Sequence, residues 1–319
     1  MNQDSPLALG IDLGGSAIKW GVVQPNGSLL ADGRFDLPNR KAETVADGLA
    51  RTVEMASSKG GERVVAIGVG SPGLIDSTRR IVRTSPNFPG WEDVQLAEMV
   101  EELIERRLPV VLENDANLLV YSETRWGGAV GLSNVVVLTL GTGVGGGVLV
   151  DGEIMRGSGG GGAELGHIPL DIHGPRCNCG ATGCFEVFCN ISGTMREAAA
   201  VYGVAKAPVD PAALTEAALE GDERAIETWR RVGAYLGAGV AALVNIFNPE
   251  AILVGGGIAN AGDFLFEPAK RAAESRCYAP NWSEVKFGQA TLKERSGLLG
   301  AAALAFERAG VDTQSTMET

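Results

Sequence analysis

Residues 138–150 read LTLGTGVGGGVLV, and Gly141, Gly143 and Gly146 have the spacing of a dinucleotide-binding loop. Such a loop needs a strand before it and a helix after it, because the pyrophosphate binds at the helix N-terminus. A β-branched run before the glycines predicts the strand. The glycines, however, lead into a second apolar run, 148–150, and then into an Asp-Gly turn pair. The pattern therefore predicts a β-hairpin and argues against a nicotinamide or flavin site.

The same pattern occurs near the N-terminus. Residues 7–13 are apolar, the letters GGS follow, and residues 18–23 predict a second strand. Aligning Asp12 with Thr139 gives few identities but the same order of strand, glycine turn and strand. Successive backbone N–H groups at such turns form an anion-binding nest, which glycine permits through positive φ angles and close approach. We predict two phosphate-binding hairpins, although either one alone is also compatible with an ordinary turn.

The composition is that of an ordinary soluble protein with an excess of tight turns. The chain has 319 residues, 45 of them glycine, with 45% hydrophobic and 21% charged residues and a net charge of −12. This length predicts two lobes. No Lys/Arg-rich block is present, so we expect no nucleic-acid partner, and an anionic substrate would be held by backbone amides and a metal ion. The first residues lack signal-peptide features, and no apolar run is long enough to span a membrane, so we expect a cytoplasmic protein without membrane association.

Predicted strands and helices alternate along the chain, which indicates an α/β fold. Besides the hairpins, we expect strands 64–69, 109–113 and 251–254, and helices 42–58, 92–107, 189–247 (broken near Pro208 and Pro211) and 296–309. The last helix is compatible with packing on either lobe. We expect a small lobe of residues 1–114 plus 301–319 and a large lobe of residues 115–300.

One short segment concentrates metal-ligand residue types. Cys177, Cys179 and Cys184 follow His167, and three thiols with one imidazole suit a tetrahedral, structural Zn²⁺ site. Clustered cysteines in a reducing compartment favour a metal over disulfides. His173 is an alternative imidazole ligand, and buried free cysteines are the alternative to a metal site. The other two cysteines are expected to be structural.

Acidic residues stand at two strand ends. Glu113, Asn114 and Asp115 lie where a strand stops and a helix starts, and helix capping is the default role for Asn114. A first-turn aspartate is held ionised by the helix dipole, as a proton acceptor in phosphoryl transfer must be. Asp12, at the end of the first strand, is well placed to hold Mg²⁺ through water, and turn initiation is its alternative role. The loops 71–73 and 85–91 have polar edges and are also compatible with plain turns.

Five motifs together resemble the ROK family of repressors, open reading frames and sugar kinases. They are DLGGSAIK (12–19), ENDAN (113–117), LGTGVGGG (140–147), ELGH (164–167) and CNCGATGCFE (177–186). They occur in order across most of the chain, and the last fits the pattern C-x-C-G-x-x-G-C-x-E throughout. Ser16 stands where threonine is usual and keeps the hydroxyl. The resemblance implies an actin-like ATPase (ribonuclease H-like) fold, with two lobes and an interdomain active-site cleft for ATP and a sugar.

The resemblance also implies roles for single residues. Asp115 matches the catalytic base that takes the proton from the 6-hydroxyl of the sugar. Its neighbours in the sugar site would be Gly73, Asn87, Asn114, Glu164, His167 and Glu186. ATP and its magnesium would be bound by Asp12, Gly14, Gly15, Ser16, Lys19, Gly141, Thr142 and Gly143, with Gly255, Gly256 and Gly257 beside the adenosine. The resemblance favours His167 over His173 as the zinc ligand in segment 164–186, and it suggests a homodimer.

The activity implied is ATP-dependent phosphorylation of a hexose, with glucose as first choice because PNFPGW (86–91) and the cysteine segment resemble family glucokinases. N-acetylglucosamine, N-acetylmannosamine, fructose and allose are alternative acceptors, and polyphosphate is an alternative donor. Family repressors carry a winged-helix domain before the sugar lobe, for which a first strand at Leu7 leaves no room. A non-catalytic sugar-sensing regulator would be expected to lose Asp115 or the phosphate glycines, and both are present.

Overall fold

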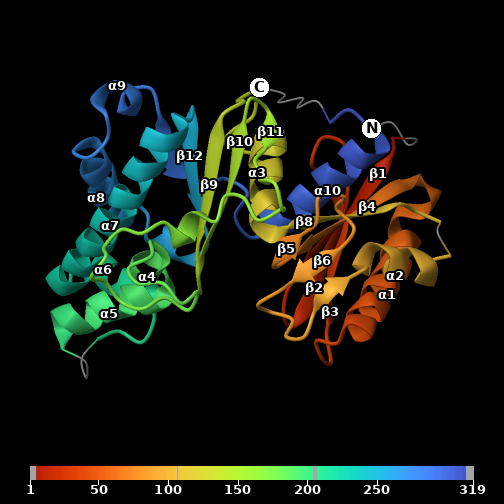
Figure 1. Cartoon of the computed structure of the whole chain (residues 1–319), viewed down its shortest axis with the longest axis horizontal. Helices are drawn as coiled ribbons and strands as arrows, with labels where there is room; N and C mark the ends of the chain where they lie inside the picture. Colours follow the sequence, from red (N-terminus) through yellow and green to blue (C-terminus); the bar gives the residue numbers. More distant parts are fainter. Residues whose placement is uncertain (1–4, 106, 204–206, 314–319) are drawn as a thin grey trace. The chain divides into compact units, whose positions relative to one another are not determined.

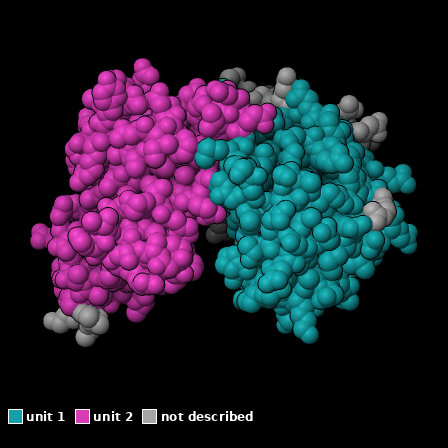
Figure 2. Space-filling view, in the orientation of Figure 1, with its two compact units in different colours: residues 1–131, 154–162, 294–319 teal, residues 132–153, 163–293 magenta. Residues whose placement is uncertain are grey.

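The computed structural model describes residues 5–105, 107–203 and 207–313. The chain divides into two compact units (Figure 2). Unit 1 comprises residues 1–131, 154–162 and 294–319, and unit 2 comprises residues 132–153 and 163–293.

These units differ from the lobes expected from the sequence, whose boundary lay at residue 114. The helix α3 (Asp115–Trp126) falls in unit 1 because it packs against α10 (Ser296–Ala309). Residues 154–162 also belong to unit 1, although residues of unit 2 flank them in the sequence. Residues 314–319 of the expected small lobe lie outside the described residues.

Unit 1 is built on a five-stranded sheet in the order β3-β2-β1-β4-β8. The first three strands form an antiparallel meander, and β4 and β8 run parallel to β1. The expected N-terminal hairpin is therefore present, and β3 extends it. The strands are β1 (Leu7–Leu13), β2 (Ala17–Val23), β3 (Leu29–Asp36), β4 (Val64–Ser71) and β8 (Val110–Asn114).

Helices cover both faces of this sheet. Residues of α1 (Ala42–Gly60) and α2 (Leu96–Leu103) share a hydrophobic core with alternate side chains of β1. On the other face the glycines of the strands admit α10 at close range (Figure 1). A Cβ on Gly10 would lie 2.0 Å from the backbone oxygen of Leu298, and one on Gly68 would lie 1.9 Å from that of Ala301. The last helix of the chain is thus fixed to the first strand, which settles where it packs.

One expected helix of unit 1 is partly wrong. The spacing of apolar residues predicted a helix over 92–107, but Glu92–Val94 forms the strand β7, and α2 spans only Leu96–Leu103. The strand pairs with β6 (Val82–Thr84), which pairs with β5 (Leu74–Ile75) in a small antiparallel sheet. Pairing with the preceding strand β6 overrides the helical pattern there. Residue 106 of the expected helix lies outside the described residues.

Unit 2 repeats the strand arrangement of unit 1. Its sheet has the order β11-β10-β9-β12-β13, in which β9 and β10 are antiparallel and β9, β12 and β13 are parallel. The opening glycine stretch is therefore a hairpin, as predicted. The strands are β9 (Val135–Leu140), β10 (Val144–Val150), β11 (Glu153–Ile154), β12 (Ala251–Gly255) and β13 (Lys286–Gln289).

The helices of unit 2 are α4 (Glu186–Cys189), α5 (Ile191–Tyr202), α6 (Pro211–Leu219), α7 (Glu223–Phe247), α8 (Asp263–Glu274) and α9 (Ala279–Trp282). Three of them, α5, α6 and α7, lie in the region 189–247 expected to be helical, whereas α8 and α9 follow it and were not expected. Asp210 caps the helix that begins at Pro211, in agreement with the break expected near that proline. Residues 204–206 of the expected region lie outside the described residues. The α/β class predicted from the sequence is confirmed. Among the described residues, no helix combines the length and apolar character needed to cross a membrane.

Candidate active site

The candidate residues of unit 1 gather at one edge of its sheet. The strands β1, β4 and β8 are parallel, so their carboxyl ends lie side by side. In register, Asp12 pairs with Gly70, and Gly70 pairs with Glu113. Two strand spacings, about 10 Å, therefore separate the backbones at Asp12 and Glu113. This edge brings the expected magnesium ligand and the ENDAN motif onto the same side of unit 1, where open α/β sheets commonly bind ligands.

The ENDAN motif forms a capped helix start. The Oδ1 atom of Asn114 accepts hydrogen bonds from the backbone N–H groups of Ala116, at 2.9 Å, and Asn117, at 3.4 Å. Capping, the default role weighed for Asn114, is therefore present. The side chain of Asp115 is exposed in the first turn of α3, and its Oδ1 atom accepts the N–H of Ala116 at 3.0 Å. An exposed carboxylate at a helix N-terminus is accessible and is favoured in its charged form.

Of the two loop residues expected in the sugar site, Gly73 contacts this helix start and Asn87 lies on a separate loop. Asn114 Nδ2 donates to the backbone oxygen of Gly73 at 2.9 Å, so the two residues are in direct contact. Gly73 has a φ of +107°, and a Cβ there would lie 2.2 Å from the backbone oxygen of Thr84, so only glycine fits. The side chain of Asn87 is exposed on a loop held by the buried, stacked rings of Phe88 and Trp91.

The first glycine hairpin carries opposite charges at its base. Asp12 on β1 faces Lys19 on β2 in register, while Gly14, Gly15 and Ser16 lie in the turn between the strands. Burial raises the pKa of Asp12 above its ordinary value, and the charge of Lys19 opposes that rise. The N–H of Gly14 closes the turn on the oxygen of Ala17 at 2.9 Å.

The second glycine hairpin is neutral and shorter by one residue. The N–H of Gly141 closes this turn on the oxygen of Gly143 at 2.9 Å. Thr142 lies between them, and Leu140 pairs with Val144. The first N–H of each turn is already hydrogen-bonded within the turn. Fewer backbone N–H groups are therefore available to bind an anion than the glycine pattern alone predicted. The triplet Gly255–Gly257 adjoins the hairpin, since Gly255 pairs with Thr139 on the parallel strand β9.

Glu186 connects this hairpin to the cysteine segment within unit 2. Its Oε2 atom accepts the backbone N–H of Val144 at 3.0 Å, and its Oε1 atom accepts from the thiol of Cys177 at 3.6 Å. Glu164 is exposed at the start of the short helix η2 (Leu165–His167), which ends in exposed His167. The expected sugar ligands of unit 2 therefore lie in the chain just before and just after the three cysteines.

The expected metal ligands converge. One ligand atom each from His167, Cys177, Cys179 and Cys184 lie within 4.8 Å of one another. The Nδ1 atom of His167 is 3.7 Å from Cys177 Sγ, and the Sγ atoms of Cys179 and Cys184 are 3.7 Å apart. A tetrahedral Zn²⁺ with metal–sulfur bonds of about 2.3 Å separates two sulfurs by about 3.8 Å, so the donor set fits that ion. His173, the alternative ligand, is not in this group.

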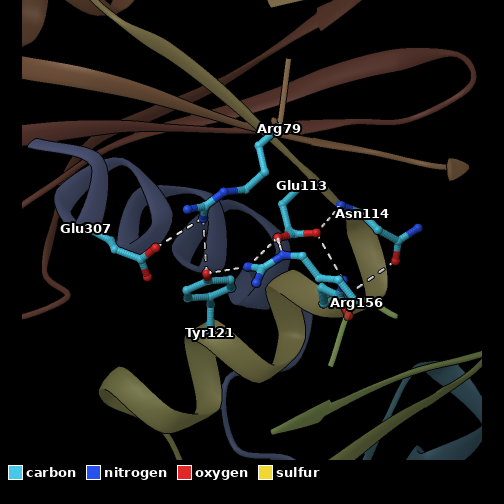
Figure 3. Close-up of polar contacts among 7 residues, drawn as sticks. Arg79, Glu113, Asn114, Tyr121, Arg156 and Glu307 are labelled. Carbon is cyan, nitrogen blue, oxygen red and sulfur yellow. Dashed lines mark hydrogen bonds and ion pairs between the residues drawn. The ribbon is translucent and has the colours of Figure 1, made fainter. Parts of the chain in front are cut away.

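Arg156, which no sequence motif singles out, contacts residues around the helix start in unit 1. Figure 3 shows its guanidinium between the carboxylate of Glu113 and the phenol of Tyr121. A lone arginine before a glycine-rich stretch carries no motif. Only the fold brings it to the end of β8.

The paired five-stranded sheets, with one glycine hairpin in each unit, define a protein of the actin-like ATPase fold. The ROK family profile matches residues 8–308, and the chain belongs to the ROK family.

Individual relatives agree with this membership. A glucokinase of Thermotoga maritima is 37% identical, over 95% of this chain and 98% of the relative. A ROK hexokinase of Thermus thermophilus is similar in structure, with a TM-score of 0.83 at 36% identity over 95% of this chain and 99% of its own. A ROK family glucokinase of Streptomyces griseus, in complex with glucose and AMPPNP, has a TM-score of 0.79 at 34% identity over 94% of this chain and 99% of its own.

Proposed function

We propose that this protein is an ATP-dependent sugar kinase that phosphorylates glucose on its 6-hydroxyl. The observation that carries the proposal is the exposed carboxylate of Asp115 in the first turn of the capped helix α3, on the sheet edge that also holds Asp12. A relative named as a glucokinase matches almost the whole length of the chain. A similar structure was solved with glucose and an ATP analogue, which supports both substrates.

The reaction follows from these groups. Asp115 accepts the proton of the 6-hydroxyl while that oxygen bonds to the γ-phosphorus, and the bond from the γ-phosphorus to the bridging oxygen breaks to release ADP. We assign the phosphates of ATP to the hairpin turns, with Gly15 and Ser16 in unit 1 and Thr142 and Gly143 in unit 2 as amide donors. Asp12 would hold Mg²⁺ through water, and that ion neutralises phosphate charge when bound.

For the remaining nucleotide contacts we keep the assignments that the resemblance implies. Gly14 and Gly141 shape the turns that meet the phosphates, and Lys19 offers a cation at the base of the first hairpin. Gly255, Gly256 and Gly257 would lie beside the adenosine, where small residues at the end of β12 leave space for a nucleoside.

The sugar ligands follow the resemblance as well. Carboxylates and amides suit a neutral polyol, because each hydroxyl both donates and accepts hydrogen bonds. Asn114 keeps one Nδ2 hydrogen after its bond to Gly73, and Asn87 presents an exposed amide. The sugar-binding residues that we propose are Gly73, Asn87, Asn114, Asp115, Glu164, His167 and Glu186.

We further propose that His167, Cys177, Cys179 and Cys184 bind one structural zinc ion. The spacing of the four ligand atoms supports this assignment. With four protein ligands the site is closed and leaves no position for an activated water. The zinc would order segment 164–186, which carries three of the proposed sugar ligands. We also propose a homodimer, which light scattering of the purified protein tests.

A coupled ADP-release assay over a panel of sugars tests the proposed function. We expect glucose to give the highest kcat/KM, above N-acetylglucosamine, N-acetylmannosamine, fructose and allose. A higher value for one of those sugars would correct the acceptor and keep the kinase. Polyphosphate in place of ATP tests the donor, and we expect no turnover with it. Sugar binding without ADP release from any sugar would indicate a sugar-sensing regulator and contradict the proposal.

A further inference from the structure

Arg156 is a partly buried residue that contacts the end of β8, with 25% of its side chain exposed. It lies in residues 154–162, the segment that belongs to unit 1 by its contacts. Its Nε and Nη2 atoms lie 2.9 Å and 2.8 Å from Glu113 Oε2, and Nη2 also donates to the hydroxyl of Tyr121 at 2.8 Å (Figure 3). Planar, forked contacts of this kind are specific to arginine, because a lysine ammonium cannot reproduce them.

Glu113 links Arg156 to the start of α3. Its side chain is only 3% exposed, so its charge depends on protein partners. While Oε2 faces Arg156, Oε1 accepts the backbone N–H of Asn114 at 3.1 Å and the Nδ2 group of Asn117 at 3.0 Å. These two residues flank Asp115 at the N-cap and in the first turn of the helix. The carboxylate of Glu113 therefore holds the backbone just before the proposed base and a side chain two residues after it.

Tyr121, further along α3, is the second residue of this helix region that binds Arg156. Its hydroxyl also accepts from Arg79 Nη1 at 3.4 Å, and Arg79 Nη1 donates to Glu307 on α10 at 3.1 Å. Burial raises the pKa of Tyr121 to about 12, so the phenol stays neutral at physiological pH. Arg156 thus holds α3 at two points, through Glu113 at its start and through Tyr121 further along.

We propose that Arg156 is a positioning residue for phosphoryl transfer, which acts through Glu113 to set the orientation of Asp115. This inference rests on the proposed function, in which Asp115 is the base. The polar contacts of the Arg156 side chain are with Glu113 and Tyr121, so it reaches the residues around Asp115 indirectly. Its influence runs through a fully hydrogen-bonded carboxylate, and a base displaced by about 1 Å can lose on the order of 10²-fold in rate.

The test is a double-mutant cycle on kcat for glucose. Arg156→Met alone is expected to lower kcat by roughly 10–100-fold, with the KM for ATP changed less than twofold, in protein that circular dichroism shows to be folded. In the Asp115→Asn background the same change is expected to lower kcat no further, because the group that Arg156 positions is already lost. An equal loss in both backgrounds, or no loss in the wild-type background, overturns the proposal.

Two further variants keep the test decisive if Arg156→Met does not fold. Arg156→Lys keeps the charge and loses the fork, and we expect a loss in kcat of roughly threefold to tenfold that again vanishes in the Asp115→Asn background. Arg83→Met is the matched control, because it removes an exposed ion pair with Asp93 in the same unit and should leave kcat unchanged. If Arg156→Lys keeps the wild-type kcat, the positioning role is wrong.

The kinase activity and the role of Arg156 are tested by different measurements. Wild-type turnover of ATP and glucose tests the kinase, and the loss caused by Asp115→Asn alone tests the base. If the Asp115→Asn variant turns over at the wild-type rate, Asp115 is not the base, and the positioning role of Arg156 is rejected with it. A kinase that needs Asp115 but is indifferent to Arg156 rejects only the positioning role.

Discussion

The two sheets of this protein share one strand order and differ in what stands at their carboxyl ends. In unit 1 the strand ends carry acids, with Asp12 in the last residues of β1 and Asp115 just beyond β8. In unit 2, glycines follow β9 and β12, at Gly141, Gly143 and Gly255–Gly257. The strand β13, which is the counterpart of β8, ends at Gln289 without an acid. The first turn places four residues between the paired Leu13 and Ile18, and the second places three between Leu140 and Val144.

This difference indicates a division of labour within a repeated architecture. Acids can hold a metal ion and accept a proton, whereas glycine turns offer backbone amides and room for close approach. We therefore expect changes to the acids of unit 1 to affect the reaction with bound substrates and magnesium, and changes at the glycine turns of either unit to affect nucleotide affinity. Four sets of variants break or sharpen this contrast.

The largest effect is expected for Asp115→Asn. Loss of the proton acceptor should lower kcat by about 10²–10⁴-fold, the range for removing a general base. Isothermal titration calorimetry should show that the variant still binds glucose. Asp47→Asn, which removes an exposed helix ion pair with Arg51 in the same unit, serves as the control and should keep the wild-type kcat. Retained turnover in Asp115→Asn excludes that residue as the base.

Asp12→Asn should have the next largest effect. The variant keeps the size of the side chain and loses its charge, and we expect kcat/KM for ATP to fall roughly 10²-fold at fixed magnesium, since a bound metal contributes several kcal/mol to such reactions. Raising the magnesium concentration should recover part of the loss. The aligned residue of unit 2 offers the comparison, because Thr139→Val should leave the magnesium dependence unchanged. An identical magnesium titration for wild type and Asp12→Asn would remove Asp12 from this role.

The glycine turns test both units with one added methyl group. A Cβ on Gly141 meets no atom within 4 Å, and one on Gly15 reaches only ordinary contact, 3.7 Å, with Arg40. The fold should therefore tolerate both alanine variants, while a bound triphosphate should not. We expect the KM for ATP to rise about tenfold, because overpacking a filled contact costs about 1–3 kcal/mol.

The control for the glycine variants is Gly288→Ala on β13, where a Cβ also meets nothing within 4 Å. It should change neither the KM for ATP nor the melting temperature. If Gly15→Ala and Gly141→Ala behave like this control, the phosphates do not lie against the turns.

Removal of the metal should have the smallest effect on the chemical step. Elemental analysis is expected to find about one zinc per chain, and Cys184→Ser should lose it. The melting temperature should then fall by about 5–10 °C, because 1 kcal/mol shifts it by about 2–4 °C in a domain of this size. Cys277→Ser, outside the cluster in the same unit, should keep both the zinc and the stability. Protein that is free of zinc and equally stable would refute the site.

Local chemistry explains which features the sequence predicted. Alternating apolar runs and glycine turns predicted both hairpins, and the cap at Asn114 predicted the start of α3. The ligand types of the cysteine segment predicted a metal cluster, and the resemblance to the ROK family favoured His167 over His173 as its imidazole. These signals lie within a few residues of one another, so they are readable without the fold.

Contacts made by the folded chain explain what the sequence could not predict. Residues Glu92–Val94 follow a helical pattern but pair as β7 with the preceding strand β6, which the spacing of apolar residues does not reveal. Arg156 and Glu113 are separated by 43 positions, and only the return of residues 154–162 to unit 1 brings them together. The boundary between units likewise depends on the packing of α10 against α3, which are far apart in the chain.

Product analysis tests the central claim most directly. Purified protein with ATP, magnesium and glucose is followed by phosphorus and carbon NMR until the ATP is consumed. Our account predicts one ADP for each glucose 6-phosphate formed, and no phosphate transfer when Asp115→Asn replaces the wild type over the same time. Free phosphate without a sugar phosphate, or a sugar phosphorylated at another hydroxyl, would contradict it.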